Sequence, residues 1–277
     1  MPRRRAYLRR ARHWIANRGW RGFVQQVLWR AKLRFQGKPV PGREGPDKGP
    51  HPFDRDYNVD TTGLVWGEAL DDPAPGTSDT RYWATGYYGI SPSAFNAALD
   101  HLALDWTRFT FVDIGCGKGR ALLLATRLPF RALLGIELSS ELAAIARRNL
   151  ETFTPPWRKP QPPPTVLTAD AAAAPFPEGP LVLFLYHPFA APVMRRFLDH
   201  VLACARACPR EIYLLYANPE LAPMLDKTPD LMRLWELWTT MTPQETAADR
   251  FSSSEEHTIA YRVQPETKKL SRALHRN

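Results

Sequence analysis

Three acidic residues stand at the ends of apolar runs, where their side chains could bind a nucleoside. They are Asp113, Glu137 and Asp170. A carboxylate such as Glu137 can accept hydrogen bonds from two ribose hydroxyls, and one such as Asp170 can accept from the exocyclic amine of an adenine. Because acids recur at consecutive run ends, a nucleotide site is a better interpretation than solvated loop residues.

A glycine-rich turn, Gly115-Cys116-Gly117-Lys118-Gly119, follows the first of these acids. Glycine lets the backbone turn tightly and approach a ligand without a Cβ in the way. The free N–H groups at the start of the following helix would then face an anionic group. The order is G-x-G-x-G, whereas dinucleotide sites use G-x-G-x-x-G, so the spacing disfavours a nicotinamide-dependent oxidoreductase.

The elements that must position these residues alternate between strand and helix from residue 91 onward. Apolar strands are expected at 109–113, 132–137, 165–170, 181–186 and 211–216. The helices between them include two with good N-caps, Ser91 and Ser139. This alternation predicts an α/β fold with a doubly wound, mostly parallel sheet, and ligands bind such sheets beyond the carboxyl ends of the strands. A final pair of edge strands is expected at 232–239 and 258–264.

The segment VDIGCGKGR, followed by LLGIEL, resembles the S-adenosylmethionine (SAM) site of class I methyltransferases, which have a seven-strand, Rossmann-like sheet. The resemblance covers roughly residues 82–264. It is closest to a broad bacterial group with Tyr-x-x-Ser/Thr before the first strand and Tyr-Asn-Pro-Phe after the fourth. It implies a SAM-dependent methyltransferase, with SAM as its cofactor.

The resemblance also implies roles for the residues around the glycine turn. Asp113 would approach the amino end of the methionine moiety. Gly115 and Gly117 would line the backbone of the methionine and ribose, and Gly119 completes the glycine motif of the cofactor site.

Further along the chain, the resemblance places Glu137 on the ribose diol. Asp170 and Ala171 would bracket the adenine. Tyr88 and Ser91, which precede the first strand of the alternating region, would close over the methionine end.

The fourth strand ends in Tyr186-His187-Pro188-Phe189, a candidate methyl-acceptor site. In related enzymes that modify amine nitrogens, this position resembles Asn/Asp-Pro-Pro-Tyr, and this sequence departs from it with His187. Histidine titrates near neutral pH, so one hypothesis makes His187 a general base, and the alternative is a histidine that only hydrogen-bonds locally. Tyr186 and Phe189 offer aromatic faces worth about 0.5–2 kcal/mol to a sulfonium, or they pack in the core.

No metal site is expected. His200, Cys204 and Cys208 recur at a spacing of four on one helical face. A rise of about 1.5 Å per residue puts the first and last of them about 12 Å apart, too far to share a zinc ion. Buried thiols on a packed helix are the better interpretation of the two cysteines.

Positive charge is concentrated at the N-terminus. Residues 1–50 hold 14 Lys and Arg against two acids, whereas the other 227 residues hold 23 against 26. An apolar stripe runs through this basic segment at helical spacing: Trp20, Phe23, Val24, Val27, Leu28, Ala31 and Phe35. The stripe could dock on the main domain, lie on an anionic membrane surface, or accompany phosphate contacts to a nucleic acid.

The expected domain organisation has three parts. Residues 1–60 form a basic helical extension with a Pro/Gly-rich linker, residues 61–264 form the methyltransferase domain, and residues 265–277 form a basic tail. No run approaches the about 20 apolar residues that a membrane span needs. Three cysteines suit a reducing compartment, so a cytoplasmic location, with membrane association through residues 1–36, is expected.

The methyl acceptor is left open at this level. A protein amine, a nucleic-acid base and a small metabolite are all compatible with the residues, and the resemblance favours a protein lysine. The rival interpretation is a regulatory protein that binds SAM or a nucleotide without chemistry.

Overall fold

The computed structural model describes residues 48–67, 70, 78–251 and 253–264, and nine residues nearer the N-terminus. Those nine are Arg12, Ile15, Gly19, Trp20, Arg21, Val24, Val27, Leu28 and Ala31. The rest of the expected helical extension, most of its Pro/Gly-rich linker and the whole expected tail, 265–277, lie outside the described residues.

A seven-strand sheet organises the described chain, with the strand order β5-β4-β3-β6-β7-β9-β8. The strands are β3 Thr110–Ile114, β4 Ala132–Glu137, β5 Thr165–Thr168, β6 Leu181–Tyr186, β7 Ile212–Ala217, β8 Leu231–Thr240 and β9 Glu255–Val263. The first five strands in the order are parallel, and β9 runs antiparallel to both of its neighbours. The expectation of two final edge strands was therefore wrong in part. Of these two strands only β8 lies at an edge of the sheet, because β9 pairs with a strand on each side.

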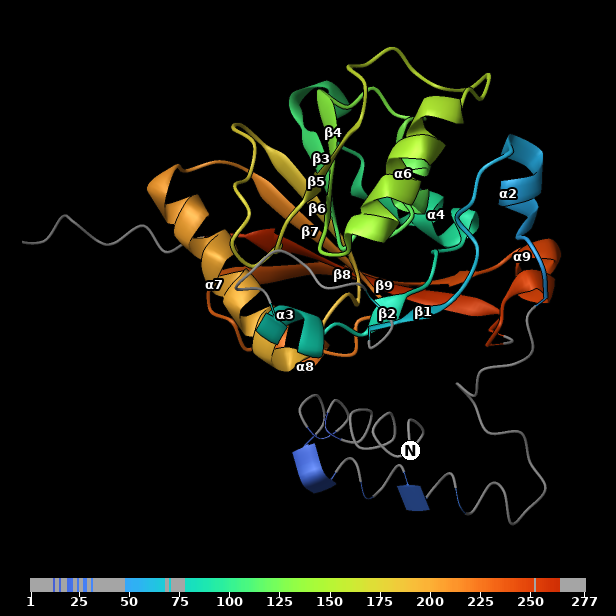
Figure 1. Cartoon of the computed structure of the whole chain (residues 1–277). Coiled ribbons are helices and arrows are strands. Elements are labelled where there is room, and N and C mark those ends of the chain that lie inside the picture. Colours follow the sequence, from blue (N-terminus) through green and yellow to red (C-terminus); the bar gives the residue numbers. More distant parts are fainter. Residues whose placement is uncertain are drawn as a thin grey trace, which may run out of the picture.

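Helices cover both faces of this sheet (Figure 1). They are α2 Pro52–Tyr57, α3 Ser78–Tyr82, α4 Pro92–Leu102, α5 Arg120–Ala125, α6 Ser140–Thr152, α7 Ala191–Ala207, α8 Ala222–Leu225 and α9 Pro243–Ala248. A 3-10 turn, η2 Trp106–Arg108, precedes β3, and a small hairpin joins β1 Val65–Trp66 to β2 Gly86–Tyr87. The helices α4 and α5 pack on one face, and α7 and α8 pack on the other.

The two cores follow from the alternation of side chains along each buried strand. On β6, Val182 and Phe184 join the core under α4 and α5, whereas Leu183 and Leu185 join the core under α7. All four are at most 1% exposed. A strand buried on both faces must be apolar throughout, which explains the sequence LVLFLY.

The winding of the sheet reverses between β3 and β6. From β3 the chain builds outward to β4 and β5, and from β6 it builds the other way to β7. The loops after β3 and β6 approach closely at this switch point, because a Cβ on Gly115 would lie 2.7 Å from the Cβ of Pro188. A crevice beyond the carboxyl ends of strands is expected at such a point.

A buried ion pair ties the segment before β1 to the start of α5. The Asp54 carboxylate accepts hydrogen bonds from the backbone N–H groups of Thr61, at 2.7 Å, and Thr62, at 2.6 Å. Its Oδ1 lies 3.7 Å from Nη2 of Arg120, and both side chains are about 5% exposed. The same segment places α2 beside α9, far away in the sequence (Figure 1). The packed unit therefore begins upstream of the expected boundary at residue 61.

The described N-terminal residues are helical and carry exposed apolar side chains. Trp20 and Leu28 are each 64% exposed, and Val27 is 49% exposed. Arg12 donates a hydrogen bond of 3.1 Å to the hydroxyl of Tyr82 in α3. None of the helices in the described parts of the chain has the length and apolarity that crossing a bilayer requires.

Removing Asp54 should destabilise the fold strongly. We expect Asp54→Ala to lower the free energy of unfolding by about 3 kcal/mol, because it leaves the buried Arg120 guanidinium without its counter-charge. Urea denaturation measures this. Asp56→Ala, at an exposed position of the same helix, is the matched control and should stay within about 0.5 kcal/mol of wild type. Equal stability of the two variants would contradict the anchoring role.

Candidate functional site

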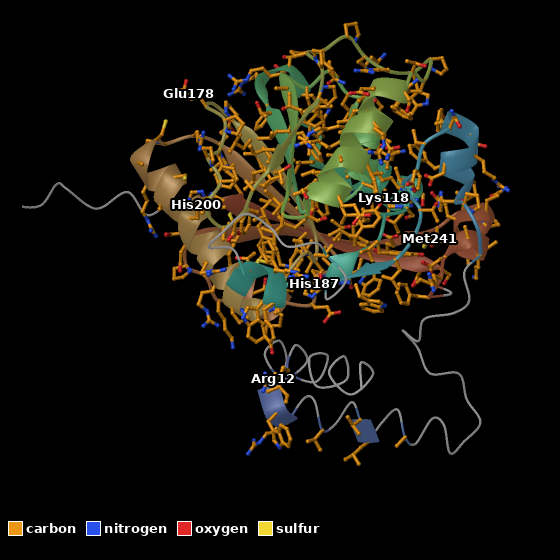
Figure 2. The ribbon with its side chains drawn as sticks, in the orientation of Figure 1. Arg12, Lys118, Glu178, His187, His200 and Met241 are labelled. Atoms are coloured by element: carbon orange, nitrogen blue, oxygen red, sulfur yellow. The ribbon has the colours of Figure 1, made fainter. Side chains whose placement is uncertain are left out.

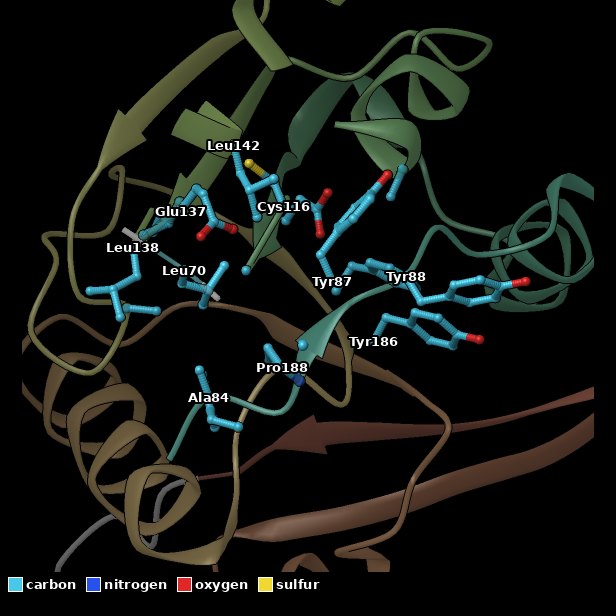
Figure 3. Close-up of a pocket in the computed structure, with 18 of the residues that line it drawn as sticks. Leu70, Ala84, Tyr87, Tyr88, Cys116, Glu137, Leu138, Leu142, Tyr186 and Pro188 are labelled. Atoms are coloured by element: carbon cyan, nitrogen blue, oxygen red, sulfur yellow. The ribbon is translucent and has the colours of Figure 1, made fainter. Parts of the chain in front are cut away.

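A cavity of about 830 Å³, part of it open to solvent, lies beyond the carboxyl ends of β3, β4 and β6 (Figure 3). Asp113, Glu137 and Asp170 all line it. The three carboxylates that the sequence places on separate strand ends therefore meet in one space.

The buried carboxylate of Asp113 has no hydrogen-bond partner in the described chain. The residue lies in β3 and is 3% exposed. Burial raises the pKa of Asp113 well above its usual value, and the charge of Glu137 raises it further. A cationic donor beside it would offset both effects, so the site suits an ammonium group.

Glu137 is held in a fixed orientation by the backbone around it. Its Oε2 accepts a hydrogen bond of 2.8 Å from the N–H of Gly117, and its Oε1 accepts one of 2.8 Å from the N–H of Ser139. Ser139 in turn caps α6 through its side chain. A carboxylate has about four lone-pair sites, so these two amides orient the group without using up its acceptor capacity.

Asp170 lies at the other end of the carboxylate row. Its Oδ1 accepts from the N–H of Ala172 at 2.9 Å, and its Oδ2 accepts from the hydroxyl of Thr80. Because Thr80 belongs to α3 and also lines the cavity, this bond fastens α3 over the expected adenine position. Ala171 lines the cavity next to it.

The three glycines of the turn have different surroundings. Gly115, at φ +72°, lines the cavity. Gly117 and Gly119 do not, which corrects the expectation that all three face the cofactor. A Cβ on Gly117 would lie 1.9 Å from the ring of Tyr87, and one on Gly119 would press on α6 at 3.2 Å. These two glycines let a ring and a helix approach the turn, and both have positive φ angles.

Part of the chain matches a known family model, and the fold is similar to several solved structures. Residues 112–206 match the family model described as a methyltransferase domain. Similar solved structures include a SAM-dependent methyltransferase from Methanosarcina mazei, at 13% identity and a TM-score of 0.47, covering 61% of this chain and 98% of that one. Magnesium protoporphyrin IX methyltransferase from Synechocystis, with bound SAM, has 13% identity, a TM-score of 0.43 and coverages of 62% and 77%. A dimethyladenosine transferase from Plasmodium falciparum has 13% identity and a TM-score of 0.43, and the match covers 64% of this chain and 63% of that one. No curated protein matches the sequence.

The matched residues run from β3 through α7 and include Asp113, the glycine turn, Glu137 and Asp170. This part of the chain is therefore similar to a methyltransferase domain. The cavity fits SAM: the buried Asp113 suits the amino group, Glu137 suits the ribose hydroxyls, and Asp170 suits the adenine amine. When bound, SAM supplies a methyl group on a sulfonium, which is already electrophilic.

The end of the cavity away from Glu137 is lined by the rings of Tyr88 and Tyr186, and Phe189 also lines the cavity. In Figure 3 the rings of Tyr88 and Tyr186 lie side by side, with both hydroxyls directed away from the Glu137 end. Burial raises the pKa of Tyr186 well above its usual value, and the nearby charges of Glu256 and Asp249 raise it further. Both tyrosines therefore stay protonated at neutral pH.

Tyr88 and Ser91 are used differently from one another. The Tyr88 hydroxyl donates to Oδ1 of Asp249 at 2.8 Å and accepts from the N–H of Arg250 at 2.9 Å, so the segment after α9 is tied to the cavity wall. Ser91 does not line the cavity. Its side chain caps α4. A role for Ser91 over the methionine end therefore stays a prediction.

His187 is also placed away from the cavity, which corrects the general-base hypothesis. Its Nδ1 lies 2.6 Å from the hydroxyl of Tyr216, and its Nε2 lies 3.9 Å from Glu220. The residue has φ +41°, and its carbonyl accepts a hydrogen bond from the hydroxyl of Thr85. This left-handed turn sends the imidazole toward β7 and α8, while the neighbouring Pro188 and Phe189 stay at the cavity.

Thr80 and Arg120 are among the cavity residues that the sequence reasoning missed. Arg120 is 4% exposed and donates to the carbonyls of Gly89 and Ile90 as well as to the hydroxyl of Thr61. A signal existed for it, because a cation in the first turn of a helix is electrostatically unfavourable and needs another reason to be there. Lys118, in contrast, points to the segment after α2, where it pairs with Asp60 at 2.6 Å (Figure 2).

The described residues contain no group of three or more His, Cys, Asp or Glu side chains that could hold a metal ion. His200 instead contacts the carbonyl of Ala174 at 2.8 Å, and Cys204 lies 3.9 Å from its ring. Cys208 is exposed at the end of α7, so the expectation of a buried thiol was wrong there.

Replacing His187 should affect stability and leave the chemistry intact. Asparagine tolerates a left-handed backbone, so we expect His187→Asn to keep SAM affinity and methyl transfer within about twofold of wild type. It should lose about 1 kcal/mol of unfolding free energy with the bond to Tyr216. Tyr216→Phe removes the same bond from the other side and is the control. A loss of transfer of about 100-fold in His187→Asn alone would restore the general-base role.

Proposed function

We propose that this methyltransferase methylates a protein amine, a lysine side chain, that enters the aromatic end of the cavity. The observation that supports the proposal is the composition of the cavity: the carboxylates of Asp113, Glu137 and Asp170 would bind the cofactor, and the rings of Tyr88 and Tyr186 line the acceptor end. A lysine has a slim four-carbon stem and a cationic head. Such a head is attracted to aromatic faces and to carboxylates.

The residues of the cavity perform this function mainly by orientation. Holding two reactants in line lowers the barrier by about 7–11 kcal/mol. Glu137 is rigid because two backbone amides hold it, and Phe189 is 5% exposed and packs on Phe197 with ring centres 5.6 Å apart. The α3 helix, fastened by Thr80, covers the space and limits access of water.

Labelled methyl transfer tests the proposal. With tritiated SAM and fractionated cell lysate, we expect counts in the protein fraction. Asp170→Ala should need about tenfold more SAM for the same rate, because one hydrogen bond worth about 1.4 kcal/mol is lost. Asp199→Ala, at an exposed position of α7, is the matched control and should behave as wild type.

Each alternative gives a different result in this assay. Counts in nucleic acid or in small metabolites would refute the lysine acceptor and keep the methyltransferase activity. Calorimetric binding of SAM without transfer to any fraction would favour a regulatory protein. Binding of NAD in place of SAM would refute the cofactor assignment.

We also infer that the basic N-terminal segment lies on an anionic membrane surface. Trp20, Val27 and Leu28 share one helical face and are about half exposed or more, with the exposed Arg12 and Arg21 beside them. Exposed apolar side chains gain free energy in the membrane interface, whereas phosphate contacts to a nucleic acid would use only the arginines.

Vesicle sedimentation tests this inference. The full chain should pellet with vesicles containing phosphatidylserine and stay in solution with neutral phosphatidylcholine vesicles. The double variant Trp20→Glu, Leu28→Glu should lose most of this binding. Trp238→Glu, at a tryptophan 60% exposed on β8, is the matched control and should bind as wild type. Equal binding of all three proteins, or none to either vesicle, would contradict the inference.

A further inference from the structure

Tyr87 lines the cavity, and the cofactor assignment gives it no role. The residue ends β2 and is 8% exposed. Its ring lies directly against the glycine turn, because a Cβ on Gly117 would lie 1.9 Å from Cδ2 of the ring and 2.3 Å from Cε2. No side chain at position 117 would fit beside this ring, so the ring and the turn fix each other's positions.

The hydroxyl of the same ring is held by the backbone upstream of β1. It donates to the carbonyl of Thr61, which lies 26 residues earlier in the chain. Thr61 is fully buried, and both its N–H and its hydroxyl donate to the Asp54 carboxylate. Nε of Arg120 donates to the Thr61 hydroxyl at 2.7 Å. The residue that receives the Tyr87 hydroxyl is therefore itself held in place from two sides.

Gly117 transmits this constraint to the carboxylate that suits the ribose. Its N–H donates to Oε2 of Glu137 at 2.8 Å. Its φ of +53° lies in the left-handed region, and glycine has no side chain that could hold it there. Lys118, the next residue of the turn, also contacts the upstream segment, since its Nζ donates to the carbonyl of Thr62 at 2.7 Å. The direction of the Gly117 amide therefore depends on contacts that reach the turn from outside it.

We propose that Tyr87 is a positioning residue of the cofactor site, which holds the Gly117 amide where it orients Glu137 toward the ribose diol of SAM. This rests on the proposed function as a SAM-dependent methyltransferase, and the nature of the methyl acceptor does not enter it. Glu137 would contact the ribose, whereas Tyr87 acts on it through Gly117. The segment around Thr61 lies upstream of the matched residues 112–206, so the cofactor site extends beyond the part of the chain that the family model covers.

The neighbouring tyrosines of the cavity wall are arranged differently. The Tyr88 hydroxyl donates to Asp249 and accepts from the N–H of Arg250. In Figure 3 the ring of Tyr87 points in another direction from the rings of Tyr88 and Tyr186, which lie together at the acceptor end. Tyr87 therefore belongs to the cofactor end of the cavity, and the other two belong to the acceptor end.

Removal of the hydroxyl from the full chain provides the first test. Tyr87→Phe keeps the ring on Gly117 and leaves the buried Thr61 carbonyl without its donor, so we expect the dissociation constant for SAM to rise about tenfold in calorimetry. Tyr261→Phe is the matched control. It removes a hydroxyl bond of 2.9 Å to Asp226 from a buried tyrosine of β9 that does not line the cavity. The two variants should lose similar unfolding free energy in urea denaturation, and Tyr261→Phe should bind SAM as wild type does.

A ligand without the 2′-hydroxyl separates positioning from a general loss of stability. Adenosine and 2′-deoxyadenosine differ only in a hydroxyl that Glu137 would bind, and competition with labelled SAM measures the affinity of both. For the wild-type protein we expect adenosine to bind about tenfold more tightly, because 2′-deoxyadenosine leaves an oriented carboxylate without a donor. In Tyr87→Phe this ratio should fall to about threefold or less, since Glu137 is no longer held firmly. Tyr261→Phe should keep the wild-type ratio.

Wild-type SAM affinity in Tyr87→Phe, or the wild-type ratio between the two nucleosides, would overturn the inference. Equally weak SAM binding by Tyr261→Phe would also overturn it, because the loss would then follow stability and not position. A wild-type protein that binds no SAM would instead refute the cofactor assignment of the proposed function.

Discussion

The site depends on the position of the Glu137 carboxylate, which joins two elements that the sequence separates. By accepting from the N–H groups of Gly117 and Ser139, it fixes the glycine turn after β3 and the start of α6 relative to one another. The turn in turn determines how closely the loops after β3 and β6 approach, since Gly115 lies against Pro188. The same carboxylate that suits a ribose diol therefore also holds the surface on which the cofactor would lie, and cofactor binding and loop geometry are coupled through one side chain.

The parts of the fold that local chemistry determines could be predicted from the sequence. The strand at 132–137, the caps Ser91 and Ser139 and the fourth strand at 181–186 agree with the structure at their first or last residues. These features need only alternation, capping and apolar runs, which neighbouring residues supply. The placement of β9 between β7 and β8 could not be predicted, because both expected strands have similar composition and the pairing is decided by contacts between distant segments.

The errors at the site share one cause, which is that backbone direction was assumed from sequence position. A strand end was taken to point its residues at the crevice, yet the left-handed turn at His187 sends its ring to the opposite core. That turn is held by Thr85, 102 residues away in the chain. Thr80 hydrogen-bonds to Asp170, which lies 90 residues later in the chain. Glu256 hydrogen-bonds to Ser91, which lies 165 residues earlier. Arg120 alone left a local signal, an unfavourable cation in the first turn of α5.

Two buried acids, one in the cavity and one outside its lining, have the same electrostatic requirement. Burial raises the pKa of both Asp113 and Glu256, so each carboxyl is disfavoured as an anion until a cation or a strong donor lies beside it. At the cofactor end this partner would be the ammonium of SAM, which would hold Asp113 ionised although Glu137 stands beside it.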